Sequence, residues 1–253
     1  MPQALVFTLA ASLASFGAVA VGERRPTWDR PGKSQIIGLL ACALGIERSD
    51  ETRQADIANG FLLAIRVDDP GHLSTDFHTA QVPPQRRNRK FATRAEELGV
   101  AKTDLKTILS RREYRVGGRY TIAVWYDPDR ADMLEQFRLK LRQPEYILFA
   151  GRKAFPLMLP TAPHFVLIDH GDIESVFTGY DRLIRPGPID LLPRTKSRHR
   201  PQIFVDADAL PGSQRVDRIE ERRDVPENRE KWRFGLRSEA LLRQRRSSEE
   251  PAP

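Results

Sequence analysis

The sequence predicts an α+β fold in which a compact alternation of strands and helices is interrupted by a long basic insertion. Apolar runs rich in β-branched and aromatic residues alternate with segments of helical periodicity. Between two predicted strands, about residues 70–118 contain few apolar residues and many Arg and Lys. After residue 160, Pro, Arg and Asp dominate and surround short apolar pieces such as Gln202–Asp208. This last region predicts a C-terminal extension that contains strands.

The N-terminal part contains a strand, a helix and a second strand, in that order. Ala4–Ala10 is a continuous apolar run and predicts a buried strand. A secretory signal peptide is the alternative, but no Lys or Arg precedes the run. Ser34–Leu44 predicts a helix because its apolar residues recur at helical spacing, and Gly45 is the expected stop. Gly60–Asp68 predicts the second strand.

The part that follows the insertion repeats the same alternation. Arg119–Asp127 is rich in β-branched and aromatic residues and predicts a strand. Ala131–Leu141 predicts a helix with one apolar face, which ends before Pro144. Glu145–Gly151 and His164–Asp169 predict further strands. The order strand, helix, strand, insertion, strand, helix, strand is a ferredoxin-like pattern with an insertion in its middle.

The charge of the chain indicates a polyanionic partner. The net charge is +7 and the isoelectric point is near 9.8, and nucleic acid is the commonest partner of such a protein. A basic surface that is only solvated is the alternative. The single cysteine excludes an internal disulfide, and no Cys/His cluster has zinc spacing. We therefore expect no metal and no cofactor. No segment is long and apolar enough to span a membrane, so we expect a cytoplasmic protein without membrane contact.

The start of the first helix resembles the end of a nucleotide-binding phosphate loop. Such a loop needs a glycine five residues before the Gly32–Lys33 pair, and that position holds Thr27. We therefore do not expect nucleotide hydrolysis. A helix N-terminus still favours an anion, and Lys33 and Ser34 add a charge and a hydroxyl, so we expect a nucleic-acid phosphate there. In the alternative, Ser34 is an ordinary N-cap and Lys33 is solvated.

Six segments along residues 4–235 carry a resemblance to a known family. They are "LVFTLAASLASFG", "RRPTWDRPGKSQIIGLLACALGIER", "DFHTAQ", "RREYRVGGRYTIAVWY", "PEYILFAGRKAFPL" and "RRDVPENREKWRF". The chain resembles the Cas-five family of CRISPR-associated proteins, in particular its type I-E Cascade branch. The resemblance implies a ferredoxin-like, RNA-recognition-type palm (residues 1–159) with the basic insertion as a β-hairpin thumb. Residues 160–236 would form an extension packed on the palm, and we expect residues 237–253 to be a disordered tail.

The resemblance also implies a function. Such a protein is a non-catalytic subunit that binds and caps the 5′ repeat-derived handle of the CRISPR RNA in an antiviral ribonucleoprotein complex. It contacts the Cas-seven backbone subunit and the large PAM-reading subunit, and it meets target DNA only indirectly through the complex. The matching segments give as candidate RNA-binding residues Arg25, Lys33, Ser34, His78, Thr79, Arg111, Arg112, Tyr114, Gly151, Arg152 and Lys153.

The candidate residues have physical reasons and also alternatives. Arg and Lys neutralise phosphates, His78 and Tyr114 can stack on bases, and Gly151 allows a phosphate to approach the backbone. Alternatively, His78 is a turn residue, Tyr114 packs inside the insertion, and Arg152 pairs with a surface carboxylate. A metal-independent endoribonuclease, as in the type I-C branch, would need a base and a cation from groups such as His78, Tyr114 and Lys33. A purely structural bridge between subunits is the third possibility.

Overall fold

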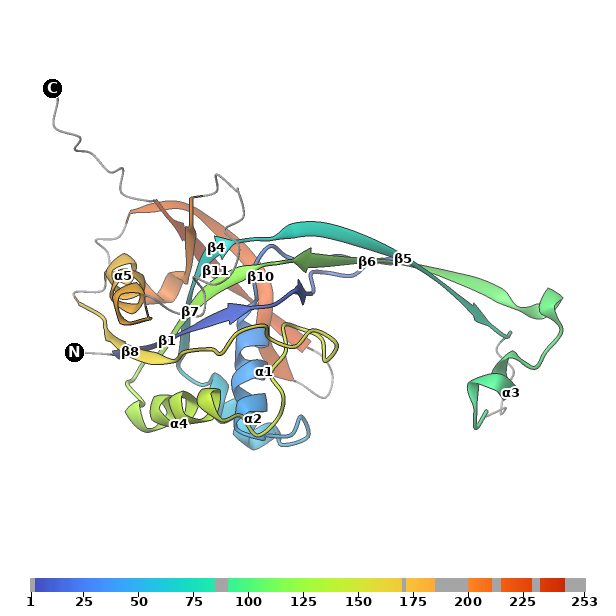
Figure 1. Cartoon of the computed structure of the whole chain (residues 1–253), viewed down its shortest axis with the longest axis horizontal. Helices are drawn as coiled ribbons and strands as arrows, with labels where there is room; N and C mark the ends of the chain where they lie inside the picture. Colours follow the sequence, from blue (N-terminus) through green and yellow to red (C-terminus); the bar gives the residue numbers. More distant parts are fainter. Residues whose placement is uncertain are drawn as a thin grey trace, which may run out of the picture.

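The computed structural model describes residues 3–84, 91–169, 172–184, 200–210, 215–228 and 233–243 (Figure 1). Within these residues the body is a mixed α+β structure around a seven-stranded sheet of order β10-β11-β9-β4-β7-β1-β8. All neighbouring strands of this sheet are antiparallel. The strands are β1 (Gln3–Ala10), β4 (Phe61–Asp69), β7 (Arg119–Tyr126), β8 (His164–Leu167), β9 (Gln202–Asp206), β10 (Val216–Asn228) and β11 (Arg233–Leu242).

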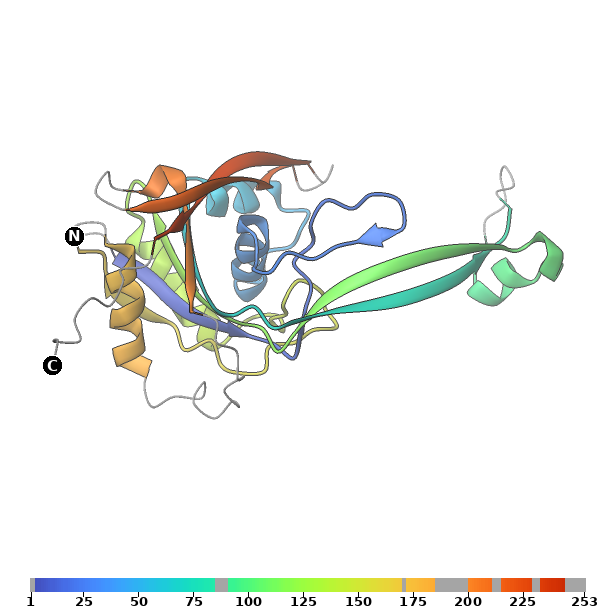
Figure 2. The ribbon, with the colours of Figure 1, turned by 90° about the horizontal axis from the view of Figure 1, so that it is seen from above.

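Helices cover both faces of the sheet (Figures 1 and 2). They are α1 (Lys33–Ala43), α2 (Glu51–Ala58) and α4 (Ala131–Arg142) on one face and α5 (Ile173–Ile184) on the other. Leu5 and Phe7 of β1 pack in the core under α1 and α4, whereas Ala4 and Val6 pack in the core under α5. Because both faces are covered, β1 is buried from Ala4 to Ala10 and is apolar at each of these positions except Thr8. None of the described helices is long and apolar enough to cross a membrane.

Most predicted elements of the body are confirmed, and two helices were not predicted. β1, α1, β4, β7, α4 and β8 lie within a few residues of their predicted positions, and Gly45 ends α1 with φ of +71°. The polar helix α2 buries one side chain, that of Ile57, so it carries no apolar periodicity. The helix α5 does carry the signal, because Ile173, Phe177 and Tyr180 recur at helical spacing on its buried face.

The predicted strand at Glu145–Gly151 is wrong. This segment is a loop that turns back on itself, and the Ala150 N–H donates to the Phe155 carbonyl at 2.8 Å. Leu148 and Ala150 are buried at alternate positions, which is the pattern of a strand. The strand that follows α4 is instead β8 (His164–Leu167), which pairs with β1 at the edge of the sheet.

The predicted disordered tail begins too early. β11 continues through Leu242, and the side chains of Arg237 and Glu239 are buried in the body. The many charged residues around Arg237 and Glu239 predict a solvated segment. In the structure these two side chains are buried and pair with each other. Residues 244–253, also part of the predicted tail, lie outside the described residues.

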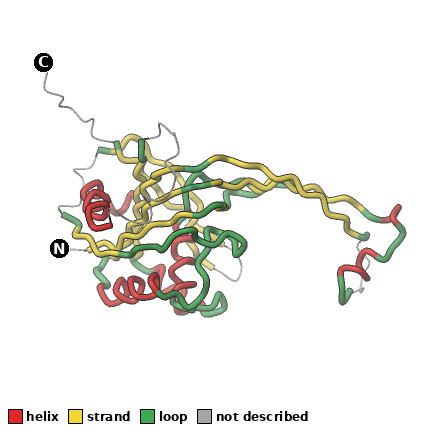
Figure 3. The backbone as a smooth tube through the Cα atoms, in the orientation of Figure 1, coloured by secondary structure: helices red, strands yellow, loops and turns green. Residues whose placement is uncertain are grey.

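The basic insertion forms a two-stranded arm that extends from the body (Figures 1 and 2). β5 (His72–Val82) is eleven residues long, and each residue has an antiparallel partner in β6 (Lys106–Val116). Figure 3 shows both strands continuing along most of the arm, with helical segments at its end. These are α3 (Arg94–Leu98) and a short 3-10 helix (Lys102–Asp104). The insertion is therefore not an irregular surface loop. Its basic cluster at residues 85–90 lies outside the described residues.

Candidate nucleic-acid interface

The N-terminal loop joins the arm as extra strands along β6. β2 (Leu13–Ala14) pairs with the root of β6, and β3 (Arg24–Arg25) pairs with it in parallel farther out. In this register Arg24 lies opposite Arg111 and Arg25 opposite Arg112, and the Arg111 N–H donates to the Glu23 carbonyl at 2.9 Å. The arginines thus form two neighbouring pairs across the two strands, Arg24 with Arg111 on one face and Arg25 with Arg112 on the other. Like charges this close repel one another, so the cluster favours a polyanion.

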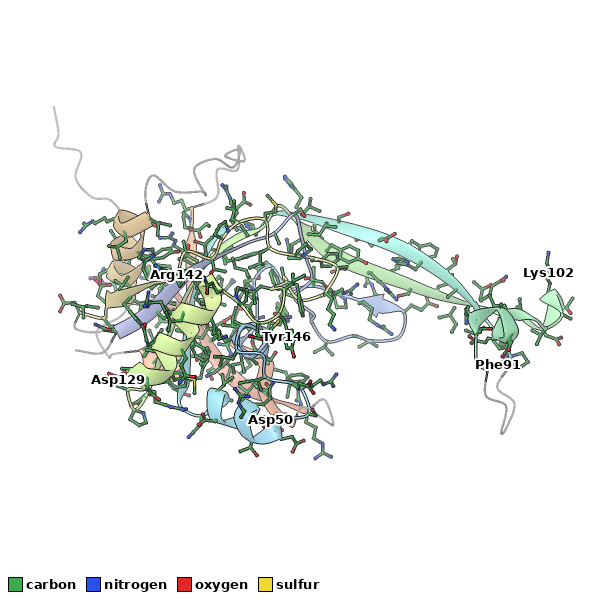
Figure 4. All side chains as sticks on the ribbon, turned by 60° about the horizontal axis from the view of Figure 1, so that its bottom comes forward. Asp50, Phe91, Lys102, Asp129, Arg142 and Tyr146 are labelled. Carbon is green, nitrogen blue, oxygen red and sulfur yellow. The ribbon has the colours of Figure 1, made fainter. Side chains whose placement is uncertain are left out.

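Strand alternation divides the arm into two faces. His78, Arg112 and Tyr114 share the first face, because His78 is paired with Ser110 and the even-numbered residues of β6 lie on one side. Thr79 and Arg111 share the second face. Figure 4 shows side chains along both strands from the body to the far end, where Phe91 and Lys102 are labelled. The candidate residues of the insertion therefore do not form one patch.

Tyr114 and Arg152 meet at the root of the first face. The Arg152 guanidinium donates to the Tyr114 hydroxyl at 3.3 Å, and its carbon lies 5.2 Å from the ring centroid. Phe155 packs edge-on against the same ring, with centroids 5.4 Å apart. Tyr114 therefore packs between the arm and the loop after α4, and Arg152 contacts this aromatic ring. The exposed Lys153 follows directly in the chain.

Gly151 is required by the contact between two backbone segments. Its φ is +86°, and a Cβ atom there would lie 2.0 Å from the Ser15 carbonyl oxygen. The Ser15 N–H also donates to the Ala150 carbonyl at 3.1 Å. The close approach that we expected from a phosphate is thus made by the backbone of Ser15.

His78 and Thr79 lie farther out on the arm, in the middle of β5. His78 is therefore not a turn residue. Its Nε2 is 2.7 Å from Asp76 Oδ2, and both side chains are about half exposed. Thr79 is exposed on the opposite face. Arg25 is also exposed, and its guanidinium donates to the Gly22 and Arg24 carbonyls.

The mouth of helix α1, where we expected a phosphate, is filled by a carboxylate of the chain itself. The Lys33 N–H donates to Asp224 Oδ2 at 2.9 Å, and the Lys33 ammonium donates to Asp206 Oδ2 at 2.8 Å. A Cβ atom on Gly32 would lie 2.7 Å from the Asp224 carboxylate. Gly32 is the N-cap, Ser34 lies in the first turn and Lys33 is paired with Asp206, so the alternative of a capping Ser34 and a solvated Lys33 is wrong.

Asp224 belongs to a buried network of charges that the sequence analysis did not predict. The network joins the segment before α1 to β9, β10 and β11, and its members are Arg30, Lys33, Arg222, Arg237, Asp206, Asp224 and Glu239. Arg237 is at its centre, with contacts of 2.7 Å to Asp206, Asp224 and Glu239. The partners lie up to 209 positions apart in the sequence, so no local pattern could have indicated them.

Burial and charge pairing oppose each other in this network. Burial by itself raises the pKa of Glu239, but Arg222, Arg237 and Arg30 outweigh it and lower that pKa to about 2. Burial lowers the pKa of Arg222, whose Nε is buried and donates no hydrogen bond. The network fixes the C-terminal strands against α1 and the loop that carries β3, and so it positions one edge of the arm.

Comparison with known proteins gives the family. The family model described as a CRISPR-associated protein (Cas_Cas5) matches residues 4–238, which is most of the chain. The chain belongs to the Cas5 family. The CRISPR system Cascade subunit CasD of Escherichia coli (strain K12) is 27% identical over 210 residues, covering 77% of this Cas5 chain and 92% of the relative.

Solved structures agree with the family at the level of the fold. One chain of a CRISPR RNA-guided surveillance complex has a TM-score of 0.60 at 22% identity, covering 94% of the Cas5 chain and 89% of that chain. A crystal structure of a Cas protein has a TM-score of 0.55 at 21% identity, with 95% of both chains covered. The candidate residues and most members of the buried network lie within residues 4–238, the range that the family model matches.

Among the described residues of this Cas5 chain, no group of three or more His, Cys, Asp or Glu side chains is arranged to hold a metal ion. The groups considered for RNA cleavage are also apart. Lys33 is held by Asp206 at 2.8 Å and His78 contacts Asp76 at 2.7 Å. Tyr114 lies four positions along β6 from the partner of His78, which is about 13 Å in an extended strand.

Proposed function

We propose that this Cas5 chain is a non-catalytic RNA-binding subunit of a type I-E CRISPR surveillance complex, which binds and caps the 5′ repeat-derived handle of the CRISPR RNA. The observation that carries the proposal is the half of the arm that adjoins the body, from Val116 to the middle of β6. There Arg24 and Arg25 lie beside Arg111 and Arg112 in register, and Arg152 lies against the Tyr114 ring. Clustered cations next to an aromatic ring bind a single strand through its phosphates and its bases.

In this proposal the body is a ferredoxin-like palm and the β5–β6 arm is its thumb. The strand order β8-β1-β7-β4 supports it. If β1, β4, β7 and β8 are numbered 1 to 4 along the chain, their order in the sheet is 4-1-3-2, which is the ferredoxin-like order. Because β8 is the fourth of these strands, the palm would extend beyond the predicted limit of residue 159 to Leu167, with its insertion at about residues 70–118. The C-terminal extension would then begin after β8 and, given the extent of β11, continue to Leu242.

We assign the candidate residues to separate roles. Arg25, Arg111, Arg152 and Lys153 neutralise phosphates, and Arg112 contacts a base or a phosphate. The exposed edges of Tyr114 and His78 contact bases, and the Thr79 hydroxyl accepts or donates a hydrogen bond on the second face. Lys33, Ser34 and Gly151 position the neighbouring loops, because Lys33 is held by Asp206 and Gly151 packs on Ser15.

The proposed partners follow from the relatives. The E. coli relative is named as a Cascade subunit, and one structural neighbour belongs to an RNA-guided surveillance complex. We propose that this chain likewise contacts a Cas7-type backbone subunit and the large PAM-reading subunit, and meets target DNA only through the complex. The separation of Lys33, His78 and Tyr114 supports a binding role over the endoribonuclease alternative.

The test is a binding and cleavage experiment with the CRISPR repeat RNA in EDTA. The wild-type chain is expected to bind the labelled repeat-derived handle without cutting it. Arg112→Ala is expected to weaken binding by about 1–3 kcal/mol if the arginine reaches a base. Arg53→Ala is the matched control, because it removes the same charge from the exposed surface of α2, which belongs to the body and lies below the start of the arm in Figure 1.

Two results would contradict the proposal. A specific cut in the repeat RNA would make the chain an endoribonuclease. If the wild type, Arg112→Ala and Arg53→Ala bind the handle RNA with equal affinity, the arm does not take part in RNA binding. A slope of log affinity against log salt that falls by about one for Arg112→Ala would assign the residue to a phosphate instead of a base.

A further inference from the structure

A partly exposed tryptophan lies next to the arginine cluster, outside the set of candidate residues. Trp28 follows β3 and keeps 36% exposure. The guanidinium carbon of Arg222 lies 4.9 Å from its ring centroid, and Arg222 is only 1% exposed among the buried charges. The cation therefore packs on the indole from the interior, and the exposed part of the ring is on the solvent side.

The backbone of Trp28 is fixed on both sides. Its N–H donates to the Phe16 carbonyl at 2.7 Å, and its carbonyl accepts from Arg115 Nε at 3.2 Å. The preceding Thr27 N–H donates to Glu113 Oε2 at 3.2 Å. Glu113 and Arg115 both belong to the second face of the arm. A large ring that is held in place and open on one side is suited to stacking with a planar ligand.

The surroundings of Trp28 favour an anionic ligand with such a planar group. Arg111 and Arg115 lie on the second face of β6, and the exposed Arg24 lies opposite Arg111 in β3. The neighbouring carboxylates already have partners: Glu113 accepts from the Thr27 N–H, and Asp29 accepts from Arg30 at 2.8 Å. A nucleotide combines the two features, since its base stacks and its phosphate is negative.

We propose that one unpaired base of a single-stranded RNA stacks on Trp28, while Arg24, Arg111 and Arg115 neutralise the phosphates beside it. Arg222 is a positioning residue, because it supports the buried side of the indole. The inference rests on the proposed function, since it needs RNA at the half of the arm that adjoins the body. It adds a stacked base on the second face of the arm, where Arg111 and Thr79 lie, whereas Arg112, Tyr114 and Arg152 serve the first face.

The test combines variants of Trp28 with RNA that lacks single bases. The probes are the repeat-derived handle RNA and a series of the same RNA with one abasic position each. Trp28→Ala and Trp28→Leu are expected to bind the intact RNA about 5- to 150-fold more weakly, the range measured for one stacked base. Trp28→Phe is expected to keep most of the affinity. At one position, removal of the base should lower the affinity of the wild type for the RNA and leave the affinity of Trp28→Ala unchanged.

The outcomes separate this inference from the proposed function. Wild-type chain that does not bind the handle RNA overturns the proposed function and this inference with it. Wild-type chain that binds, together with Trp28→Ala of equal affinity, overturns the inference alone. The inference is also overturned if Trp28→Ala binds every abasic RNA more weakly than the wild type does by the same factor, because Trp28 would then act only by supporting the fold. Thermal melting of Trp28→Leu and Trp28→Phe shows whether both variants keep the fold, and the comparison between them then isolates the aromatic ring.

Discussion

Glu239 is predicted to stabilise the fold as a buried anion, and its replacement by Gln tests the charge network directly. Glu239 is 2% exposed, and its carboxylate lies 2.7 Å from Arg237 and 3.3 Å from Arg222. Glu239→Gln keeps the size of the side chain and removes its charge. Arg237 keeps Asp206 and Asp224, but the network loses one negative charge in the interior, where an uncompensated charge is costly.

The magnitude follows from the pKa of Glu239. The pKa falls from 4.5 to about 2 on folding, and each unit corresponds to about 1.4 kcal/mol, so the ionised group contributes about 3 kcal/mol. Because the folded pKa is the lower one, this contribution is complete above the unfolded pKa and is lost as the pH falls through the folded pKa. At pH 3 about half of it remains.

The assay is denaturant unfolding of the wild type and Glu239→Gln between pH 7 and pH 3. The free energy of unfolding should differ by about 3 kcal/mol at pH 7 and by about half as much at pH 3. The control is Glu145→Gln, which breaks an exposed pair with Lys140 and should cost at most about 1 kcal/mol at either pH. A difference for Glu239→Gln that is below 1 kcal/mol, or that does not change with pH, would refute the reasoning.

Two further predictions concern packing. Gly151→Ala forces an alanine to φ of +86° with its Cβ 2.0 Å from the Ser15 oxygen, and should lower the free energy of unfolding by at least about 2 kcal/mol. Gly17→Ala is its control, since nothing lies within 4 Å of that position, and a similar loss in both would contradict the argument. Phe137→Ala empties a fully buried site under the sheet and should cost about 3–5 kcal/mol. Leu139→Ala on the exposed side of the same helix should cost less than about 0.5 kcal/mol, and equal midpoints in urea for the two variants would refute the placement of α4.

The elements that the sequence predicts well are those whose apolar pattern is set by local packing. β1 and β7 are apolar because helices cover both of their faces, and α1 and α4 carry a buried stripe at helical spacing. The segment Glu145–Gly151 has a comparable pattern but forms a loop. Its backbone hydrogen bonds go to its own turn and to Ser15, and which partner a backbone finds is not written in the pattern of the segment.

The candidate site shows the same division. The abundance of arginine in the insertion predicts a polyanion, but only the parallel pairing of β3 with β6 brings Arg24 and Arg25 beside Arg111 and Arg112. The helix mouth has the local chemistry of a phosphate site. The tertiary structure fills it with Asp224, a residue 191 positions away, which the chain provides in place of an external anion.

By itself the sequence determined the family, the alternation of strands and helices, and the basic character of the insertion, because each depends on residues that are close in the chain. Only the tertiary structure decided which charges are buried and which are offered to a ligand. Arg237 is buried with three carboxylates, whereas Arg111 is exposed on the arm. The two cannot be told apart from their neighbours in sequence, since burial of a charge depends on partners that folding brings from distant segments.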